Sequence, residues 1–278
     1  MVKKQLIMDK ALELFSEQGF EATSVQQITE RCGISKGAFY LSFKSKDELI
    51  LALIDYFMMQ ITADIDYSVR NCSNKEELLY VFYFTTFRSF SKHSAFAKMF
   101  LKEQTQTFNN EELISKHDYY DSHINESILY MLDQLYGEQI EETKYDLLIC
   151  IKGFIQIYSG LYLRFNLPLD IDSLTKSLVE KTALLAQHST IPFISGDIIR
   201  IIKGPIHEQV TTEHIAALIE QKIGDIENPI EQESLQILKD DLFKTNTSLA
   251  ITKGLLENIK NNPQCKWISY LIREYYQL

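Results

Sequence analysis

An all-α fold is the class that this sequence predicts, and three observations lead to it. Apolar residues recur three and four positions apart through most of the chain, which is the period of a helix with one buried face. The 278 residues include only five Pro and ten Gly, so few positions interrupt a helix. Asn, Gly and Pro gather at the breaks between the periodic segments, where they end helices.

Residues 3–18 are expected to form the first helix. Ile7, Ala11 and Phe15 recur at helical spacing, and Gly19 follows the last turn. Because one face is apolar and the other is charged, we expect this segment to be an amphipathic helix that supports the helices after it, and not a signal peptide.

The stretch from Thr23 to Lys46 predicts a helix-turn-helix. Ser24 with Gln27 three residues later is a capping-box pattern, which starts a short helix. Gly33 provides the left-handed backbone of the turn, and Ser35 caps a second helix of about two turns. Two short helices joined in this way place the second one in the major groove of DNA.

The residue types of the second helix fit contact with DNA. Small and polar side chains near its start let the backbone approach the bases, and Tyr, Thr, Ser and Lys side chains donate to phosphates. We expect Ser35, Lys36, Gly37, Ala38 and Leu41 to meet the bases, Thr23, Tyr40, Lys44 and Lys46 to hold phosphates, and Ser24 to lie in the same interface. The alternative is an ordinary helical hairpin in which Tyr40 and Phe43 only pack the core.

The run from Ala11 to Leu49, ALELFSEQGFEATSVQQITERCGISKGAFYLSFKSKDEL, resembles the N-terminal domain of the TetR family of bacterial transcriptional regulators. The matching features are the entry ALELFSEQGFEATSV, the turn and second helix I-x-x-x-C-G-I-S-K-G-x-F-Y, and the S-K-D-E-L opening of the next helix. The resemblance implies a homodimer that binds double-stranded DNA at a near-palindromic operator and responds to a small molecule. Repression released by that molecule is the expected mode.

The distribution of charge fits a DNA-binding head on an acidic body. The net charge is −10, but residues 1–46 contain seven basic and five acidic residues, a balance of +2. The acidic remainder would repel DNA and restrict contact to the head. Because the positive excess is small, we expect binding to need two heads from a dimer.

A long helix is expected to begin at Asp47, with an apolar stripe from Leu49 to Ile65. In proteins of the resembled family this helix joins the head to the body. Further helices are expected at 75–91, 94–106, 110–136, 141–165 and 171–188. By the same resemblance, the last two would form a four-helix dimer interface that sets two recognition helices roughly 34–36 Å apart.

The segment from Tyr80 to Phe100 is unusually aromatic. The resemblance implies a ligand cavity in this part of the chain, for a lipophilic effector that is apolar or aromatic. The candidate pocket residues are Tyr83, Phe87, Phe96, Phe100, Tyr119, Tyr158 and Tyr162. The alternative is that these rings only pack the core.

Metal, redox and catalytic motifs are weak in this sequence. The four Cys residues are far apart, which favours free thiols in a cytoplasmic protein. His117 and Asp121 have helical i, i+4 spacing and metal-capable side chains, but they match no strict motif, so we expect no metal site and no cofactor. Enzyme signatures such as G-x-S-x-G and H-E-x-x-H are absent. With no run of eighteen apolar residues, no membrane span is expected.

The chain continues for about ninety residues beyond the part that the resemblance covers. After a connector at 189–197, helices are expected near 197–203, 211–224, 230–245, 247–261 and 263–277. We therefore expect three parts: a DNA-binding head at 1–46, a ligand-binding and dimerisation body at 47–190, and an additional helical domain at 191–278. The last could extend the dimer interface, bind another protein, cap the cavity or only pad the dimer.

Two other functions fit the same sequence. The chain could be a helical interaction protein that works through its C-terminal domain, or a protein that sequesters a small molecule. The first predicts no specific binding to DNA, and the second predicts ligand binding without effect on DNA.

Overall fold

The computed structural model describes residues 2–106, 111–165, 170–194, 198, 211–244, 247–276 and 278, and within these residues it contains helices and no strand. The head contains α1 (Val2–Gln18), α2 (Val25–Cys32) and α3 (Lys36–Tyr40). The body contains α4 (Lys46–Arg70), η1 (Lys75–Glu77), α5 (Leu78–Lys92), α6 (Ser94–Gln106), α7 (Glu111–Tyr136), η2 (Gly137–Ile140), α8 (Lys144–Phe165) and α9 (Ile171–His188). The C-terminal domain contains α11 (Thr212–Ile223), α12 (Pro229–Asp241), α13 (Leu249–Ile259) and α14 (Lys266–Tyr276). The all-α prediction is confirmed.

Local capping sets the bounds of the short helices in the head. Ser24 and Gln27 form the predicted capping box at the start of α2. Gly33 ends α2 in the left-handed region at φ 66°, and the hydroxyl of Ser35 accepts from the backbone of Ala38 to start α3. Ser45 caps α4 in the same way, through the backbone of Glu48 at 3.0 Å. These caps hold α3 at a fixed angle to α2.

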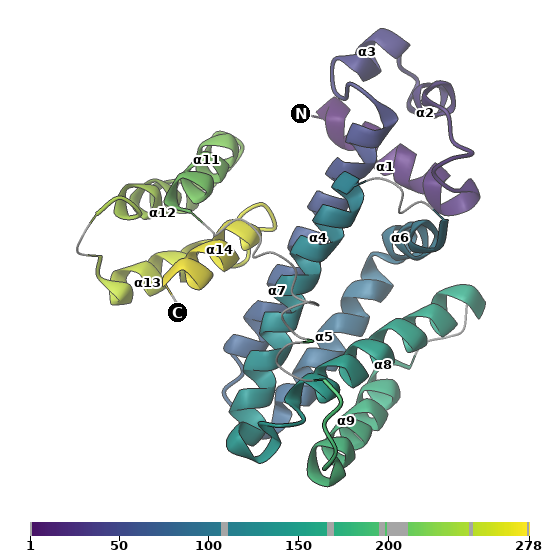
Figure 1. Cartoon of the computed structure of the whole chain (residues 1–278). Coiled ribbons are helices and arrows are strands. Elements are labelled where there is room, and N and C mark those ends of the chain that lie inside the picture. The colour runs from purple at the N-terminus through teal and green to yellow at the C-terminus, as the bar shows by residue number, and fades with distance from the viewer. Residues whose placement is uncertain are drawn as a thin grey trace.

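The helix α4 contacts helices of the head, the body and the C-terminal domain. Its 25 residues form one uninterrupted helix, roughly 37 Å long at 1.5 Å per residue. It starts in the head, packs against α5 and α7 in the body, and also packs against α14 of the C-terminal domain. Figure 1 shows the head at one end of α4 and the C-terminal domain at its side.

Two carboxylates of α4, those of Asp55 and Asp66, form polar contacts with α7. Asp55 of α4 accepts hydrogen bonds from Lys116 at 2.7 Å and from Tyr120 at 2.9 Å. The buried Asp66, three turns further along α4, pairs with Arg70 at 2.8 Å and accepts from Ser127 of α7 at 3.1 Å. Since buried carboxylates are stable only when they are paired, these contacts define the register of the two helices.

The C-terminal domain docks onto α4 and α7 through aromatic side chains of α14. Trp267 and Tyr270 stack with ring centroids 4.8 Å apart. Trp267 also lies 5.6 Å from the Tyr120 ring, and the Tyr270 hydroxyl lies 2.7 Å from Nδ1 of His123. This apolar and hydrogen-bonded contact anchors the domain to the body.

Most predicted helices lie within three residues of the observed ones. The helix expected from 141 begins at Lys144, because η2 and a turn occupy the residues before it. The helix expected from 263 begins at Lys266, since Asn262 accepts from the backbone of Gln264 and Cys265 in a turn. The helix expected at 197–203 falls outside the described residues except for 198.

Glycine substitutions in the head should separate backbone strain from crowding. Gly33→Ala places a side chain at φ 66° with no atom within 4 Å of the new methyl group, so backbone strain alone should cost about 1–2 kcal/mol. Gly37→Ala meets only Ser35 Oγ at 3.8 Å on a helical backbone, so it should be neutral or stabilising by about 0.5 kcal/mol. Urea unfolding followed by circular dichroism measures the free energy of unfolding of both variants. Equal stability of the two variants would contradict backbone strain at position 33.

Candidate nucleic-acid interface and ligand cavity

The helix α3 presents an exposed surface at the tip of the head, as Figure 1 shows. Ser35, Lys36 and Gly37 are exposed at its start. The Tyr40 side chain is 53% exposed and Leu41 is 91% exposed, although both are large and partly apolar. An isolated apolar side chain that projects from a tightly held helix can contact a base or a thymine methyl group.

The neighbouring apolar side chains of the motif turn inward. Phe39 and Phe43 are buried in the head with Phe15 and Ile28. Tyr40 therefore does not belong to the core, whereas Phe43 does. This division leaves Ser35, Lys36, Gly37, Tyr40 and Leu41 on the exposed side of the motif.

Two residues that the sequence predicts as phosphate ligands are engaged inside the head. Thr23 is buried, donates its hydroxyl hydrogen to Gly19 O at 2.7 Å and accepts from Gln18 at 3.0 Å. The Lys46 ammonium donates to Phe20 O at 2.7 Å and lies 4.1 Å from the centre of the Phe20 ring. Both side chains hold the loop between α1 and α2. The spacing of residues in the sequence does not predict these contacts.

The other predicted residues keep exposed polar groups near α3. Lys44 is exposed, and its backbone N–H donates to Glu48 at 2.6 Å. Lys36 lies 3.3 Å from Gln26 of α2, which joins the two helices at the exposed face. Ser24 is exposed as well, at the N-terminus of α2.

Lys4 is a residue that sequence reasoning missed. Its ammonium lies 5.0 Å from the centre of the Phe43 ring, so α1 places a positive charge beside the turn that follows α3. Arg31, in contrast, faces Glu13 at 3.7 Å and Glu17 at 3.6 Å and contributes less net charge. No local pattern distinguishes these two cations, because folding alone brings Lys4 to the turn.

A cavity of about 680 Å³ lies in the body among α4, α5, α6, α7 and α8. Its walls are mainly apolar and aromatic, as is usual for small-molecule sites. The lining residues are Met58, Ile61, Ile65, Phe82, Thr86, Phe90, Phe96, Ala97, Phe100, Ile114, His117, Asp121, Ile124, Lys152, Ile155, Gln156 and Ser159.

Polar side chains of α7 and α8 gather in one part of this cavity wall. Lys152 of α8 pairs with Asp121 of α7 at 2.6 Å. Asp121 also accepts from Asn125 at 3.0 Å. His117 stacks on Phe100 with ring centroids 6.0 Å apart. The pair His117 and Asp121 thus faces the cavity, and its carboxylate is neutralised by a lysine.

Only two of the predicted pocket residues, Phe96 and Phe100, line this cavity. The other five lie elsewhere, as the following contacts show. Tyr83 and Phe87 are buried on α5. The Tyr83 hydroxyl shares a 2.8 Å hydrogen bond with Thr182 of α9, and burial raises the pKa of Tyr83. The Tyr119 ring packs against Trp267 of the C-terminal domain, with ring centroids 6.1 Å apart. Tyr158 and Tyr162 are half-buried on α8. The number of aromatic residues in the sequence predicts which part of the chain holds the cavity, but it does not predict which face of each helix lines it.

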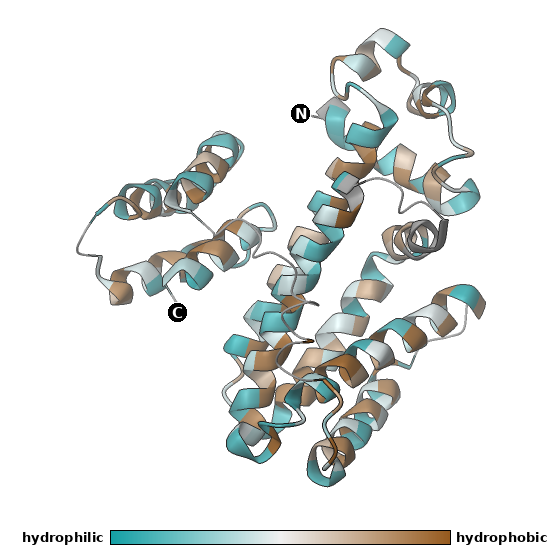
Figure 2. Ribbon diagram, viewed as in Figure 1, coloured by the Kyte–Doolittle hydropathy of each residue, from teal (hydrophilic) through white to brown (hydrophobic). Residues whose placement is uncertain are grey.

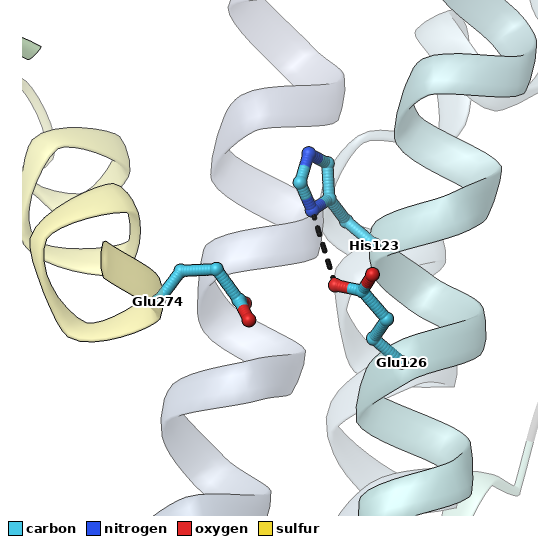
Figure 3. A group of neighbouring side chains, drawn as sticks. All are labelled: His123, Glu126 and Glu274. Carbon is cyan, nitrogen blue, oxygen red and sulfur yellow. Dashed lines mark ion pairs between the residues drawn. The ribbon is translucent and has the colours of Figure 1, made fainter. Parts of the chain in front are cut away.

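A group of metal-capable side chains joins α7 to α14 (Figure 3). His123 Nδ1 lies 3.6 Å from a carboxylate oxygen of Glu126, and Glu274 reaches toward them from α14. Burial, reinforced by Glu126, raises the pKa of the Glu274 carboxyl, while Arg70 opposes that shift from 3.8 Å. The Tyr270 hydroxyl already occupies His123 Nδ1 at 2.7 Å. We interpret the group as a polar contact of the docked domain.

The head matches a known protein family. Residues 7–53 match the family model described as "Bacterial regulatory proteins, tetR family". This range contains α2, α3 and the start of α4, which are the elements that build the exposed face.

Two relatives from Bacillus subtilis (strain 168) match most of the chain. The uncharacterized HTH-type transcriptional regulator YuxN is 27% identical over 98% of this chain and 98% of its own. The uncharacterized HTH-type transcriptional regulator YerO is 29% identical over 92% of this chain and 89% of its own. Both alignments therefore extend through much of the C-terminal domain.

Solved structures share the fold over about two thirds of the chain. The fatty acid degradation regulator FadR of Bacillus halodurans has a TM-score of 0.58 and 18% identity, and covers 68% of this chain and 96% of its own. FadR of Bacillus subtilis in complex with stearoyl-CoA has a TM-score of 0.52 and 21% identity, and covers 67% of this chain and 99% of its own. With the matched head, the exposed α3 and the full-length relatives, the chain belongs to the TetR family and is a helix-turn-helix, DNA-binding transcriptional regulator.

Proposed function

We propose that this regulator is a cytoplasmic homodimeric repressor that a lipophilic small molecule releases from a near-palindromic operator. The observation that carries the proposal is the continuity of α4, which begins in the DNA-binding head and lines the cavity with Met58, Ile61 and Ile65. A ligand that displaces this part of α4 also tilts the head, because an uninterrupted helix moves as a unit.

The head binds DNA through α3 in the major groove. Lys36, Gly37 and Leu41 approach the base edges, and Tyr40 and Lys44 donate to phosphates. Their exposure supports these roles. Lys4 adds a phosphate contact beside the Phe43 turn.

Exposed apolar side chains on α8 and α9 support a dimer. They are Ile149, Ile157, Leu161, Phe165 and Leu184. Figure 2 shows hydrophobic residues along both helices. Solvent exposure of a patch of this kind is unfavourable, so a second copy of the chain covers it in our proposal. Two copies then place their α3 helices about one DNA turn apart, roughly 34–36 Å.

The same surface explains the membrane-like composition of α8. By length and composition alone, Lys144–Phe165 is apolar enough to cross a membrane, and 22% of its apolar window is buried within one chain. Lys152, however, pairs with Asp121 inside the body, and the helix packs against α5, α7 and α9. We therefore assign the remaining apolar face to the dimer.

The cavity favours a ligand with a long apolar part and a polar group. The walls contributed by α4, α5 and α6 are apolar except for Thr86, while Lys152, Asp121 and Gln156 offer both donors and acceptors. A fatty acyl compound has this composition, and the FadR structure with stearoyl-CoA adds support for that class. Such a ligand lowers DNA affinity by stabilising a head spacing that no longer fits two half-sites.

Binding of the purified protein to DNA flanking its own coding region tests the proposal. A specific complex with a footprint of two half-sites is expected, together with weaker binding to random DNA and a steep dependence on salt. Equal and weak binding to both DNAs would favour the interaction protein instead. Ligand binding that leaves the operator complex unchanged would favour sequestration.

Lys44 and Lys46 should respond differently to loss of charge. Lys44→Gln should weaken binding on every DNA sequence and reduce the salt slope by about one unit, with an unchanged melting temperature. Lys46→Gln should destabilise the head by about 1–2 kcal/mol, because it removes the charged hydrogen bond to Phe20 O. Fluorescence anisotropy across a salt series and thermal unfolding measure the two effects. A normally folded Lys46→Gln with a reduced salt slope would return Lys46 to the phosphate contacts.

The dimer face can be tested with a matched pair of isoleucines. Ile157 on α8 and Ile230 on α12 are both 62% exposed. Ile157→Glu should dissociate the dimer and reduce operator affinity at least about tenfold, since an interface charge without a partner is costly. Ile230→Glu should leave both unchanged. Sedimentation velocity gives the oligomeric state, and a dimeric Ile157→Glu variant would refute this interface.

Filling the cavity should abolish the response to ligand. Ile155→Trp adds volume to the wall formed by α8, so release of the operator by stearoyl-CoA or stearate should need at least about tenfold more ligand. Operator affinity without ligand should remain within about twofold of the wild-type value, which serves as the internal control. Unchanged release by either compound would place the acyl site elsewhere.

A further inference from the structure

A second, polar cavity of about 170 Å³ lies between α4 and the C-terminal domain. It is separate from the apolar cavity in the body and shares no lining residue with it. The lining residues are Ala63, Asp64, Asp66 and Tyr67 of α4, Lys260 and Asn261 after α13, and Lys266, Ser269, Tyr270 and Arg273 of α14. A space of about this volume accommodates one molecule of roughly the size of benzene.

Three buried polar atoms on α14 are left without hydrogen-bond partners in the part of the chain that the structure describes, and two of them belong to residues that line the cavity. These two are Oγ of Ser269, whose residue is only 4% exposed, and Nε of Arg273. Both residues line the cavity and are one helical turn apart. Because a buried polar group without a partner is costly, a hydrogen-bond acceptor at this place would stabilise both atoms.

The acidic residues of the cavity are already neutralised. Asp64 forms an ion pair with Lys266, and Asp66 forms one with Arg70 at 2.8 Å. They therefore do not oppose an anion as strongly as isolated carboxylates would.

The basic groups of the cavity are held in place but keep donors available. Lys260 contacts Glu257 at 2.7 Å, and an ammonium has three donors. Arg273 lies over the Tyr67 ring at 5.2 Å and reaches Glu257 only through Nη2, at 3.5 Å. The Nε edge of the guanidinium is thus pre-oriented, which suits a carboxylate or phosphate oxygen.

We propose that this cavity binds a small oxyanion, either a carboxylate or a phosphate compound. One oxygen accepts from Ser269 Oγ and Arg273 Nε, while Lys260 lies at the same site and supplies further positive charge. The bound anion joins α14 to Lys260 after α13 and so stabilises the C-terminal domain. This binding does not depend on the proposed repressor function or on the effector in the body.

Isothermal titration calorimetry on the full-length chain tests the site directly. Inorganic phosphate and succinate are the two probes, titrated at constant ionic strength in a chloride buffer, and thermal unfolding is followed in parallel. At least one probe should bind with a dissociation constant in the millimolar range or tighter and raise the melting temperature. The probe that binds more tightly distinguishes the phosphate from the carboxylate class.

Two serines provide a matched pair of variants. Ser269→Ala removes a hydroxyl that has no protein partner among the described residues, so the protein should fold normally and bind the anion about twofold to tenfold more weakly. Ser159 Oγ is likewise buried without a partner, but it lines the apolar cavity. Ser159→Ala should therefore leave anion binding unchanged.

Arg273→Gln tests the charge. Its affinity for the anion should fall at least about tenfold, since hydrogen bonds to charged groups are stronger than neutral ones. Absence of binding by both probes, or equal binding by wild type, Ser269→Ala and Arg273→Gln, would overturn the proposal and leave water as the content of the cavity.

Discussion

The packing of α4 against every other part of the molecule is the constraint on which the structure depends. Its first turn is held by Ser45 and by the Lys46 contact with Phe20, its middle forms the cavity wall, and its last turns carry Asp66 and Arg70. Because all backbone hydrogen bonds of a helix act together, a displacement at one of these places shifts the others. The head, the cavity and the C-terminal domain are therefore connected through the single helix α4.

The two cavities lie against different sides of this helix and differ in chemistry. Met58, Ile61 and Ile65 face the apolar cavity, whereas Asp64 and Tyr67 face the polar one. Burial of apolar surface favours a lipophilic compound in the first, and oriented donors favour an anion in the second. Both cavities therefore border α4, one against the body and one against the C-terminal domain.

Docking of that domain rests on polar atoms placed within an aromatic cluster. Trp267 packs against the Tyr120 ring, while Tyr270 and Glu274 contact His123 and Arg70. Aromatic packing provides affinity, and the buried hydrogen bonds require one orientation of α14. The relatives YuxN and YerO align with this chain over 98% and 92% of its length, so both alignments extend into the C-terminal domain.

Local sequence alone determined the helical class, the capped helix-turn-helix and the exposure of Lys36, Gly37 and Leu41, because caps, left-handed glycines and helical periodicity act over a few residues. Tertiary structure decided the rest. It engaged Thr23 and Lys46 with the loop between α1 and α2, brought Lys4 beside the Phe43 ring, placed Tyr83 and Tyr119 away from the cavity, and paired Asp121 with Lys152. These outcomes depend on which face of each helix meets its neighbours, and that choice is made by packing between segments far apart in the chain.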